Sequence, residues 1–140
     1  DESISKDGVI PCSSVEKLYE TCEIISVNIP ATAETKKSIG LALLSKMPKG
    51  AVIVNTARKE VIDNDGLVQA MEARPDMKYL TDILPDNHEE MLAKFPGRYF
   101  ATPKKMGAQT AEANINAGIA AACQIVDFIK NGNQRFRVNK

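Results

Sequence analysis

Residues 51–58 read AVIVNTAR, and this stretch decides the predicted fold. An unbroken apolar run over residues 51–54, preceded by Pro48 and Gly50, indicates a short strand that is buried on both faces. Such strands are typical of parallel sheets, because crossover helices cover both sides of the sheet. A basic residue, Arg58, follows shortly after the strand. The stretch therefore predicts a buried parallel strand with a charged group beyond its carboxyl end.

Further strand and helix signals alternate on either side of this stretch. Short apolar runs occur at residues 23–29 (EIISVNI), 78–81 (KYLT) and 99–102 (YFAT). Helices are predicted from a cap at Ser13 or Ser14 to Cys22, over Leu41 to Met47 in a run that starts at Thr35, from Asp63 to Ala73, and from Asn87 to Phe95. Proline and glycine residues end three of them. This alternation predicts an α/β fold with a mostly parallel, doubly wound sheet.

The last part of the sequence predicts one long helix from about residue 108 to residue 130. Its apolar positions recur at helical spacing, at Ile115, Ile119, Ala122, Val126 and Ile129. A helix of this length, on the order of 30 Å, exceeds what a return to the next strand needs. We expect it to lie against something other than this sheet, although a terminal core helix is the alternative. Residues 1–107 and 108–140 are therefore treated as two parts, with a closing strand or tail at residues 135–140.

The composition excludes several classes of protein. The 18 basic and 18 acidic side chains cancel, which argues against a nucleic-acid-binding surface. No apolar run approaches the roughly 18 residues that a membrane span requires. Cys12, Cys22 and Cys123, with His88 as the single imidazole, form neither a disulfide framework nor a zinc motif, so we expect packing thiols. The prediction is a cytoplasmic protein that binds neither nucleic acid nor a membrane.

Chemically useful residues follow each predicted strand. They are Asn28, Ile29 and Pro30, then Asn55, Thr56, Ala57 and Arg58, then Asp82, and finally Thr102 to Lys105. Ligands of open parallel sheets bind beyond these strand ends. A guanidinium there can hold a carboxylate by two parallel hydrogen bonds, which favours a small carboxylic acid as ligand. The structural alternatives are a surface pair of Arg58 with Glu60, and a cap or turn role for Asp82.

Three stretches in the same order resemble motifs of the D-isomer-specific 2-hydroxyacid dehydrogenase family. Residues 24–40 are similar to the family's SLHxPxTxxTxxxIG stretch, residues 47–51 to its MKPGA turn, and residues 52–63 to its second signature. The resemblance implies an incomplete Rossmann-type sheet, NAD as cofactor and a 2-hydroxy or 2-keto acid as substrate. It also implies a homodimer for the full-length protein. Within the family, the resemblance is closest to the branch that opens serine biosynthesis.

The resemblance also implies roles for individual residues. Arg58 would bind the substrate carboxylate and carbonyl oxygen, and Asp82 would bind the nicotinamide amide. The cofactor would be lined by Asn28, Ile29, Pro30, Thr56, Ala57 and Arg58. Asp1 would be the acid that bonds the adenosine ribose.

The sequence departs from the family where the catalytic base is expected. The family's histidine follows a Thr/Ser-Pro pair, whereas this chain reads Thr102-Pro103-Lys104-Lys105. Counting from the strand selects Lys104 and counting back from Gly107 selects Lys105; a stiff strand favours Lys104. A lysine acts as a base near neutral pH when desolvation and a nearby cation lower its pKa.

A second departure concerns the partner of that base. The family's glutamate position holds Asn87, with Asp86 one residue earlier. Asp86 is therefore predicted either to pair with the lysine or, like Asn87, to cap a helix. His88 is a less favoured candidate for the base.

The third departure is the absence of a G-x-G-x-x-G turn, which would cradle the dinucleotide phosphates. We therefore expect the C-terminal portion of a longer NAD-dependent dehydrogenase, inactive and weak in NAD binding by itself. The alternatives are an inactive family member that acts as a nucleotide-sensing scaffold or corepressor, and another α/β nucleotide-binding enzyme.

Overall fold

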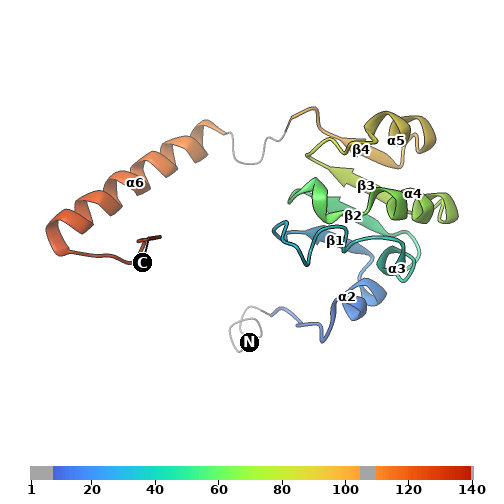
Figure 1. The fold of residues 1–140 in the computed structure, drawn as a ribbon, viewed down its shortest axis with the longest axis horizontal. Helices are drawn as coiled ribbons and strands as arrows, with labels where there is room; N and C mark the ends of the chain where they lie inside the picture. The colour runs from blue at the N-terminus through green and yellow to red at the C-terminus, as the bar shows by residue number, and fades with distance from the viewer. Residues whose placement is uncertain (1–7, 105–109, 140) are drawn as a thin grey trace. The chain divides into compact units, whose positions relative to one another are not determined.

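The computed structural model describes residues 8–104 and 110–139, and its central feature is a four-stranded parallel sheet (Figure 1). The strands are β1 (Ile24–Val27), β2 (Val52–Asn55), β3 (Lys78–Thr81) and β4 (Tyr99–Ala101). They lie in the order β1-β2-β3-β4, and each pairs in parallel with the next. The predicted strands and the α/β class are confirmed.

Short helices precede β1 and connect the strands, as predicted, except that the helix expected over residues 41–47 ends at Leu44. They are α2 (Val15–Thr21), α3 (Leu41–Leu44), the 3-10 turn η1 (Lys59–Val61), α4 (Asn64–Ala73) and α5 (His88–Lys94). Ser14 caps α2, because its hydroxyl accepts the Lys17 amide proton at 3.1 Å. Thr35 starts no helix; its Oγ1 accepts from the Thr32 amide at 2.7 Å and donates to the Pro30 carbonyl at 2.6 Å. The threonine hydroxyl thus closes a turn ahead of the helix, which begins at Leu41 as predicted.

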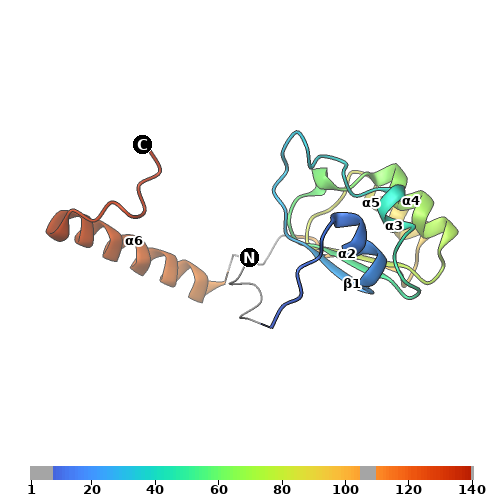
Figure 2. The same ribbon diagram turned by 90° about the horizontal axis from the view of Figure 1, so that it is seen from below.

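The two faces of the sheet differ in burial. Side chains alternate along each strand, so that Ile25, Ile53 and Tyr79 share one buried face at paired positions. Helices α3, α4 and α5 lie together on one side of the sheet in Figure 2. On the opposite face, Ile24 is 68% exposed and Phe100 is 59% exposed. The expectation that both faces are covered is therefore met on one face only in the described part of the chain.

A charged cluster joins the turns that precede β2 and β3. The Arg74 guanidinium donates to the carbonyls of Met47 at 2.7 Å and Pro48 at 2.6 Å, and it pairs with Asp76 at 2.7 Å. The Asp76 carboxylate also accepts the Gly50 amide proton at 2.7 Å. These two hydrogen bonds, that of Arg74 first, lower the pKa of Asp76 well below its usual range.

The chain divides into two compact units, the sheet unit of residues 1–104 and the helix unit of residues 105–140. The division falls after residue 104, whereas the predicted division falls after residue 107. The helix unit contains α6 (Ala111–Asn131), which begins at the Thr110 cap and ends at Gly132, whose φ of 66° is left-handed. The predicted long helix is confirmed, and none of its residues is buried. The following tail forms no strand within residues 133–139.

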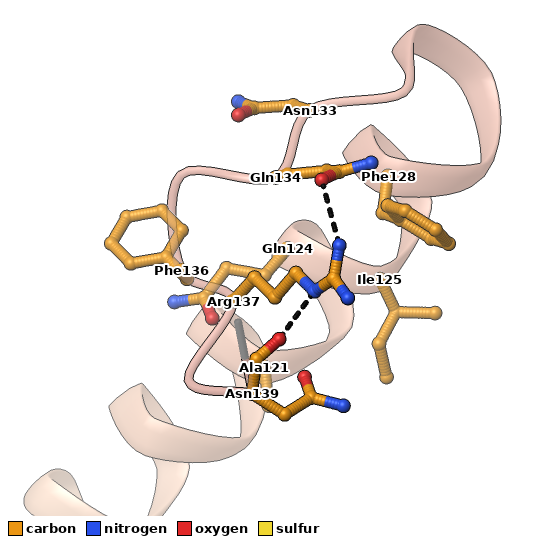
Figure 3. Close-up of a pocket in the computed structure, with 9 residues that line it drawn as sticks. All are labelled: Ala121, Gln124, Ile125, Phe128, Asn133, Gln134, Phe136, Arg137 and Asn139. Atoms are coloured by element: carbon orange, nitrogen blue, oxygen red, sulfur yellow. Dashed lines mark hydrogen bonds between the residues drawn. The ribbon is translucent and has the colours of Figure 1, made fainter.

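The tail folds against α6 within the helix unit (Figure 3). Arg137 donates to the side-chain oxygen of Gln134 at 3.3 Å and to the Asn139 carbonyl at 2.5 Å. A 570 Å³ hollow between tail and helix is lined in part by Ile125, Phe128 and Phe136. Its apolar side chains remain more than half exposed.

The cysteines differ from expectation. Cys22 packs against the core, as predicted, but Cys12 and Cys123 are exposed. Cys12 precedes the first described helix, and Cys123 lies on α6, which buries nothing. Among the described residues, no helix has the length and apolar character that crossing a membrane requires.

Candidate active site

The residues expected to bind cofactor and substrate meet at the carboxyl ends of β1 and β2. An open hollow of 580 Å³ is lined by Asn28, Ile29, Pro30, Ala31, Thr56, Ala57 and Arg58. The loops after the two strands face each other because parallel strands end at the same edge of a sheet. The structure thus brings together the predicted residues of these two loops, except Asn55, which is buried beneath the second loop and does not line the hollow.

Hydrogen bonds hold the loop after β1 in a defined shape. The side-chain Nδ2 of Asn28 donates to the Ser26 hydroxyl at 3.0 Å and to the Ser26 backbone carbonyl at 3.2 Å. Beyond it, the Thr35 hydroxyl binds the Pro30 carbonyl, as described above. Ile29 and Pro30 are therefore placed at the hollow by local polar contacts on both sides of them.

The loop after β2 is organised by Asn55, whose role the sequence analysis did not assign. Its side chain is fully buried. Its Oδ1 accepts the Ala57 amide proton at 3.0 Å, and its Nδ2 donates to the Arg58 carbonyl at 3.0 Å. An amide at the end of a buried strand is the sequence signal for this role, because a buried polar group must find partners nearby.

Arg58 presents a guanidinium with donors available for a ligand. The side chain is exposed, and Nη1 donates to the Ala57 carbonyl at 2.9 Å. No ion pair between Arg58 and Glu60 occurs among the described residues, so the surface-pair alternative is not observed. The planar fork can still form a bidentate contact with a carboxylate.

Asp82 has an unsatisfied carboxylate oxygen. Its backbone amide donates to the Asn55 carbonyl at 3.3 Å, while Oδ1 is buried and has no hydrogen-bond donor in the described part of the chain. A buried acceptor is costly until a donor reaches it. Asp82 follows β3 and does not line the hollow at the ends of β1 and β2, but a carboxamide N–H group, such as that of a nicotinamide ring, is a chemically suitable donor for its unsatisfied oxygen. No G-x-G-x-x-G turn in this sequence would hold the pyrophosphate.

Asp86 does not serve as the partner of Lys104 in this structure. It forms an ion pair of 2.5 Å with Lys59, which raises the pKa of the lysine chiefly through that hydrogen bond. Lys59 follows Arg58 in the sequence, and its ammonium binds Asp86 in the loop after β3. The helix-cap alternative also fails for its neighbour, because Asn87 makes no side-chain cap bond. The side-chain Oδ1 of Asn87 is buried and has no hydrogen-bond partner among the described residues.

The two candidate bases differ in what the structure shows. Lys104 is exposed, and its carbonyl accepts a hydrogen bond from the Thr102 hydroxyl at 3.0 Å. Lys104 does not line the 580 Å³ hollow in its described position. Lys105 and Asp1 lie outside the described residues.

His88 is engaged elsewhere. Its Nδ1 lies 2.8 Å from the Tyr99 hydroxyl, and the two rings pack edge to face. Burial raises the pKa of Tyr99 to about 12, so the phenol stays neutral beside the imidazole. This contact gives His88 a structural role in packing α5 against β4. No cluster of three or more metal-ligating side chains occurs in residues 8–104 and 110–139.

Comparison with known proteins gives a consistent result. Residues 1–103 match the family described as D-isomer specific 2-hydroxyacid dehydrogenase, NAD binding domain. D-3-phosphoglycerate dehydrogenase of Haemophilus influenzae is 31% identical over 132 residues, which cover 90% of this chain and 32% of the relative. D-3-phosphoglycerate dehydrogenase 1 of Saccharomyces cerevisiae is 25% identical over 140 residues, which cover 91% of this chain and 30% of that relative. The chain thus spans about a third of the length of these relatives.

Solved structures agree with the sequence comparisons. The NAD⁺-bound 3-phosphoglycerate dehydrogenase of Entamoeba histolytica superposes with a TM-score of 0.81 and 50% identity, over 92% of this chain and 42% of that one. D-mandelate dehydrogenase of Rhodotorula graminis gives a TM-score of 0.72 and 25% identity, over 91% of this chain and 37% of that one. The parallel sheet and the extent of the match lead to one conclusion: this chain belongs to the family of D-isomer specific 2-hydroxyacid dehydrogenases.

Proposed function

We propose that this chain supplies the nicotinamide end of the active site in an NAD-dependent dehydrogenase of D-2-hydroxy acids. The observation that carries the proposal is the hollow at the ends of β1 and β2, with the Arg58 guanidinium on its lining. The unsatisfied oxygen of Asp82 adds a second polar contact at the next strand end. We further propose 3-phosphoglycerate as the substrate, because several similar relatives carry that activity in their names.

The chain's residues divide the work of such a reaction. Arg58 holds the substrate carboxylate through two N–H groups and fixes the orientation of C2. Asp82 accepts a hydrogen bond from the nicotinamide carboxamide and fixes the ring. NAD, when bound, supplies the acceptor for the hydride that leaves C2 with its electron pair. Lys104 or Lys105 takes the hydroxyl proton at Nζ, so that a 2-keto acid remains.

Two surfaces with exposed apolar side chains support the proposal that further protein segments cover them in the functional enzyme. The outer face of the sheet exposes Ile24 and Phe100, and α6 buries no side chain. We propose that residues 1–107 belong to the nucleotide domain and that residues 108–140 lead toward a substrate domain. In the same proposal, the full-length protein is a homodimer.

A hybrid enzyme tests the proposed function. We define it as the Entamoeba histolytica 3-phosphoglycerate dehydrogenase in which these 140 residues replace the matching segment. We expect it to reduce NAD⁺ with 3-phosphoglycerate, whereas the 140-residue chain alone has no turnover and binds NAD weakly. Normal turnover by the isolated chain would contradict the division of the site between two parts.

Variants of the hybrid enzyme identify the base. We expect Lys104→Ala to lower kcat by roughly 100-fold or more, and Lys105→Ala to have a small effect. The opposite pattern assigns the proton transfer to Lys105. A folded but inactive hybrid enzyme favours the scaffold or corepressor alternative, for which the specific observation is the pairing of Asp86 with Lys59 instead of a catalytic base.

A further inference from the structure

Asn55 connects the ends of β2 and β3 through a single buried side chain and its own backbone. Within its own loop, the carboxamide accepts from the Ala57 amide and donates to the Arg58 carbonyl, both at 3.0 Å. Its Nδ2 also lies 3.4 Å from the hydroxyl of Tyr79 on β3. Its backbone carbonyl accepts from the Asp82 amide at 3.3 Å. The residue is therefore bonded both to the loop that carries Arg58 and to the residue expected to bind nicotinamide.

We propose that Asn55 is the positioning residue that fixes Arg58 relative to Asp82, with the buried Tyr79 hydroxyl as its anchor on the neighbouring strand. The inference rests on the proposed function, since it concerns the alignment of a substrate carboxylate with the nicotinamide ring. Asn55 touches neither ligand itself, because its side chain is fully buried. It acts through the backbone of the residues that do.

The chemistry of the carboxamide explains why asparagine suits this position. One side chain must accept a hydrogen bond from the Ala57 backbone amide and donate hydrogen bonds to the Arg58 carbonyl and the Tyr79 hydroxyl, and a carboxamide offers both functions. Aspartate has nearly the same shape and keeps the acceptor, but it has no donor and brings a carboxylate oxygen against the Arg58 carbonyl. Burial raises the pKa of Tyr79, so its hydroxyl remains neutral and available as the anchor.

Hydrogen exchange in the 140-residue chain tests the local part of the proposal. We expect Asn55→Ala to increase the exchange rate of the Ala57 amide at least about tenfold, because the accepting oxygen is lost. Asn55→Asp keeps that oxygen and should leave the Ala57 amide protected. Ile53→Val is the matched control, since it trims the buried core on the same strand without changing a polar contact. Unchanged Ala57 exchange in Asn55→Ala would overturn the proposal.

Kinetics of the hybrid enzyme test the functional part. A misplaced substrate-binding group can cost up to roughly 100-fold in rate, so we expect Asn55→Asp to lower kcat/KM for 3-phosphoglycerate by about 10- to 100-fold, mainly through a higher KM. Tyr79→Phe removes one oxygen and should change kcat/KM about two- to fivefold in the same direction. Ile53→Val lowers stability but should keep the KM of the unchanged hybrid enzyme.

The outcomes separate the two proposals. A KM for Asn55→Asp and Tyr79→Phe that equals that of Ile53→Val would show a merely structural residue and overturn the positioning role. If the unchanged hybrid enzyme has no dehydrogenase activity, the proposed function fails, and the exchange of the Ala57 amide alone then decides whether Asn55 holds the loop. Tyr79→Phe keeps the experiment decisive if Asn55→Asp does not fold, because it preserves the packing of the ring.

Discussion

Helices α4 and α6 are both amphipathic, yet they differ completely in what they bury. Five of the ten residues of α4 are buried, among them Leu67 and Met71, and the helix packs against α3. None of the 21 residues of α6 is buried, although Ile115, Ile119 and Ile129 recur on it at helical spacing. An amphipathic pattern therefore predicts a helix and its apolar side, but it does not identify what covers that side.

The tyrosines of this chain allow the unfolding of the sheet unit to be followed separately from that of α6. All three tyrosines, Tyr19, Tyr79 and Tyr99, belong to the sheet unit, and the chain has no tryptophan. Tyrosine fluorescence therefore reports the unfolding of the sheet unit, whereas far-ultraviolet circular dichroism also reports α6. Matched substitutions in the two helices can be followed separately.

The largest expected difference comes from trimming one aliphatic side chain in each helix. Leu67→Ala opens a cavity under α4, where the side chain is 1% exposed, and should cost about 2–5 kcal/mol of the free energy of unfolding. Ile119→Ala removes the same number of carbons from a side chain that is 57% exposed. It should leave the urea midpoint of tyrosine fluorescence unchanged. Equal losses in the two variants would show that α6 belongs to the same core.

Glycine substitutions sharpen the comparison with a smaller expected effect. A methyl group on Gly66 would lie 2.7 Å from the Leu41 amide nitrogen and 2.8 Å from the Asp63 carboxylate. Gly66→Ala should therefore separate α3 from α4 and cost about 1–3 kcal/mol.

The control for this prediction is Gly118→Ala in α6, where a methyl group would meet nothing within 4 Å. This variant should stabilise the helix by about 0.5–1 kcal/mol and increase the helical dichroism signal. Destabilisation of the sheet unit by Gly118→Ala would indicate that the small residue allows a close packing contact on α6.

The smallest expected effect concerns two carboxylates with lowered pKa values. Asp76 joins the turns before β2 and β3, so its stabilising contribution is present above its unfolded pKa of about 3.8 and is lost as the pH falls further. Asp76→Asn should remove that part of the acid dependence of urea unfolding. Within residues 8–104 and 110–139, the Asp127 carboxylate accepts hydrogen bonds from Asn131 and Asn133, which both belong to the helix unit, so Asp127→Asn should leave the tyrosine transition unchanged between pH 7 and about 3.

Sequence reasoning succeeded where short-range physics decides the outcome. Apolar runs predicted all four strands and helical periodicity predicted the long helix, because both patterns depend on residues that are close in the sequence. The strand ends also predicted the lining of the 580 Å³ hollow, since parallel topology places them at one edge.

The missed features depend on residues far apart in the sequence. The ion pair between Asp86 and Lys59 joins groups 27 positions apart, and the bond from Asn55 to Tyr79 crosses the sheet. Neither distance follows from a local pattern. The exposed outer face of the sheet was missed for a related reason: the strands carry apolar side chains on both faces, but the described helices cover one.

The most direct test of the central claim is kcat/KM for 3-phosphoglycerate in the Arg58→Lys variant of the hybrid enzyme. Lysine keeps the positive charge but loses the planar fork that would hold the substrate carboxylate. We predict a loss of roughly 100-fold or more in kcat/KM, while Arg135→Lys on the tail retains the activity of the unchanged hybrid enzyme. An Arg58→Lys variant with undiminished kcat/KM would contradict the assignment of the strand-end hollow as the substrate site.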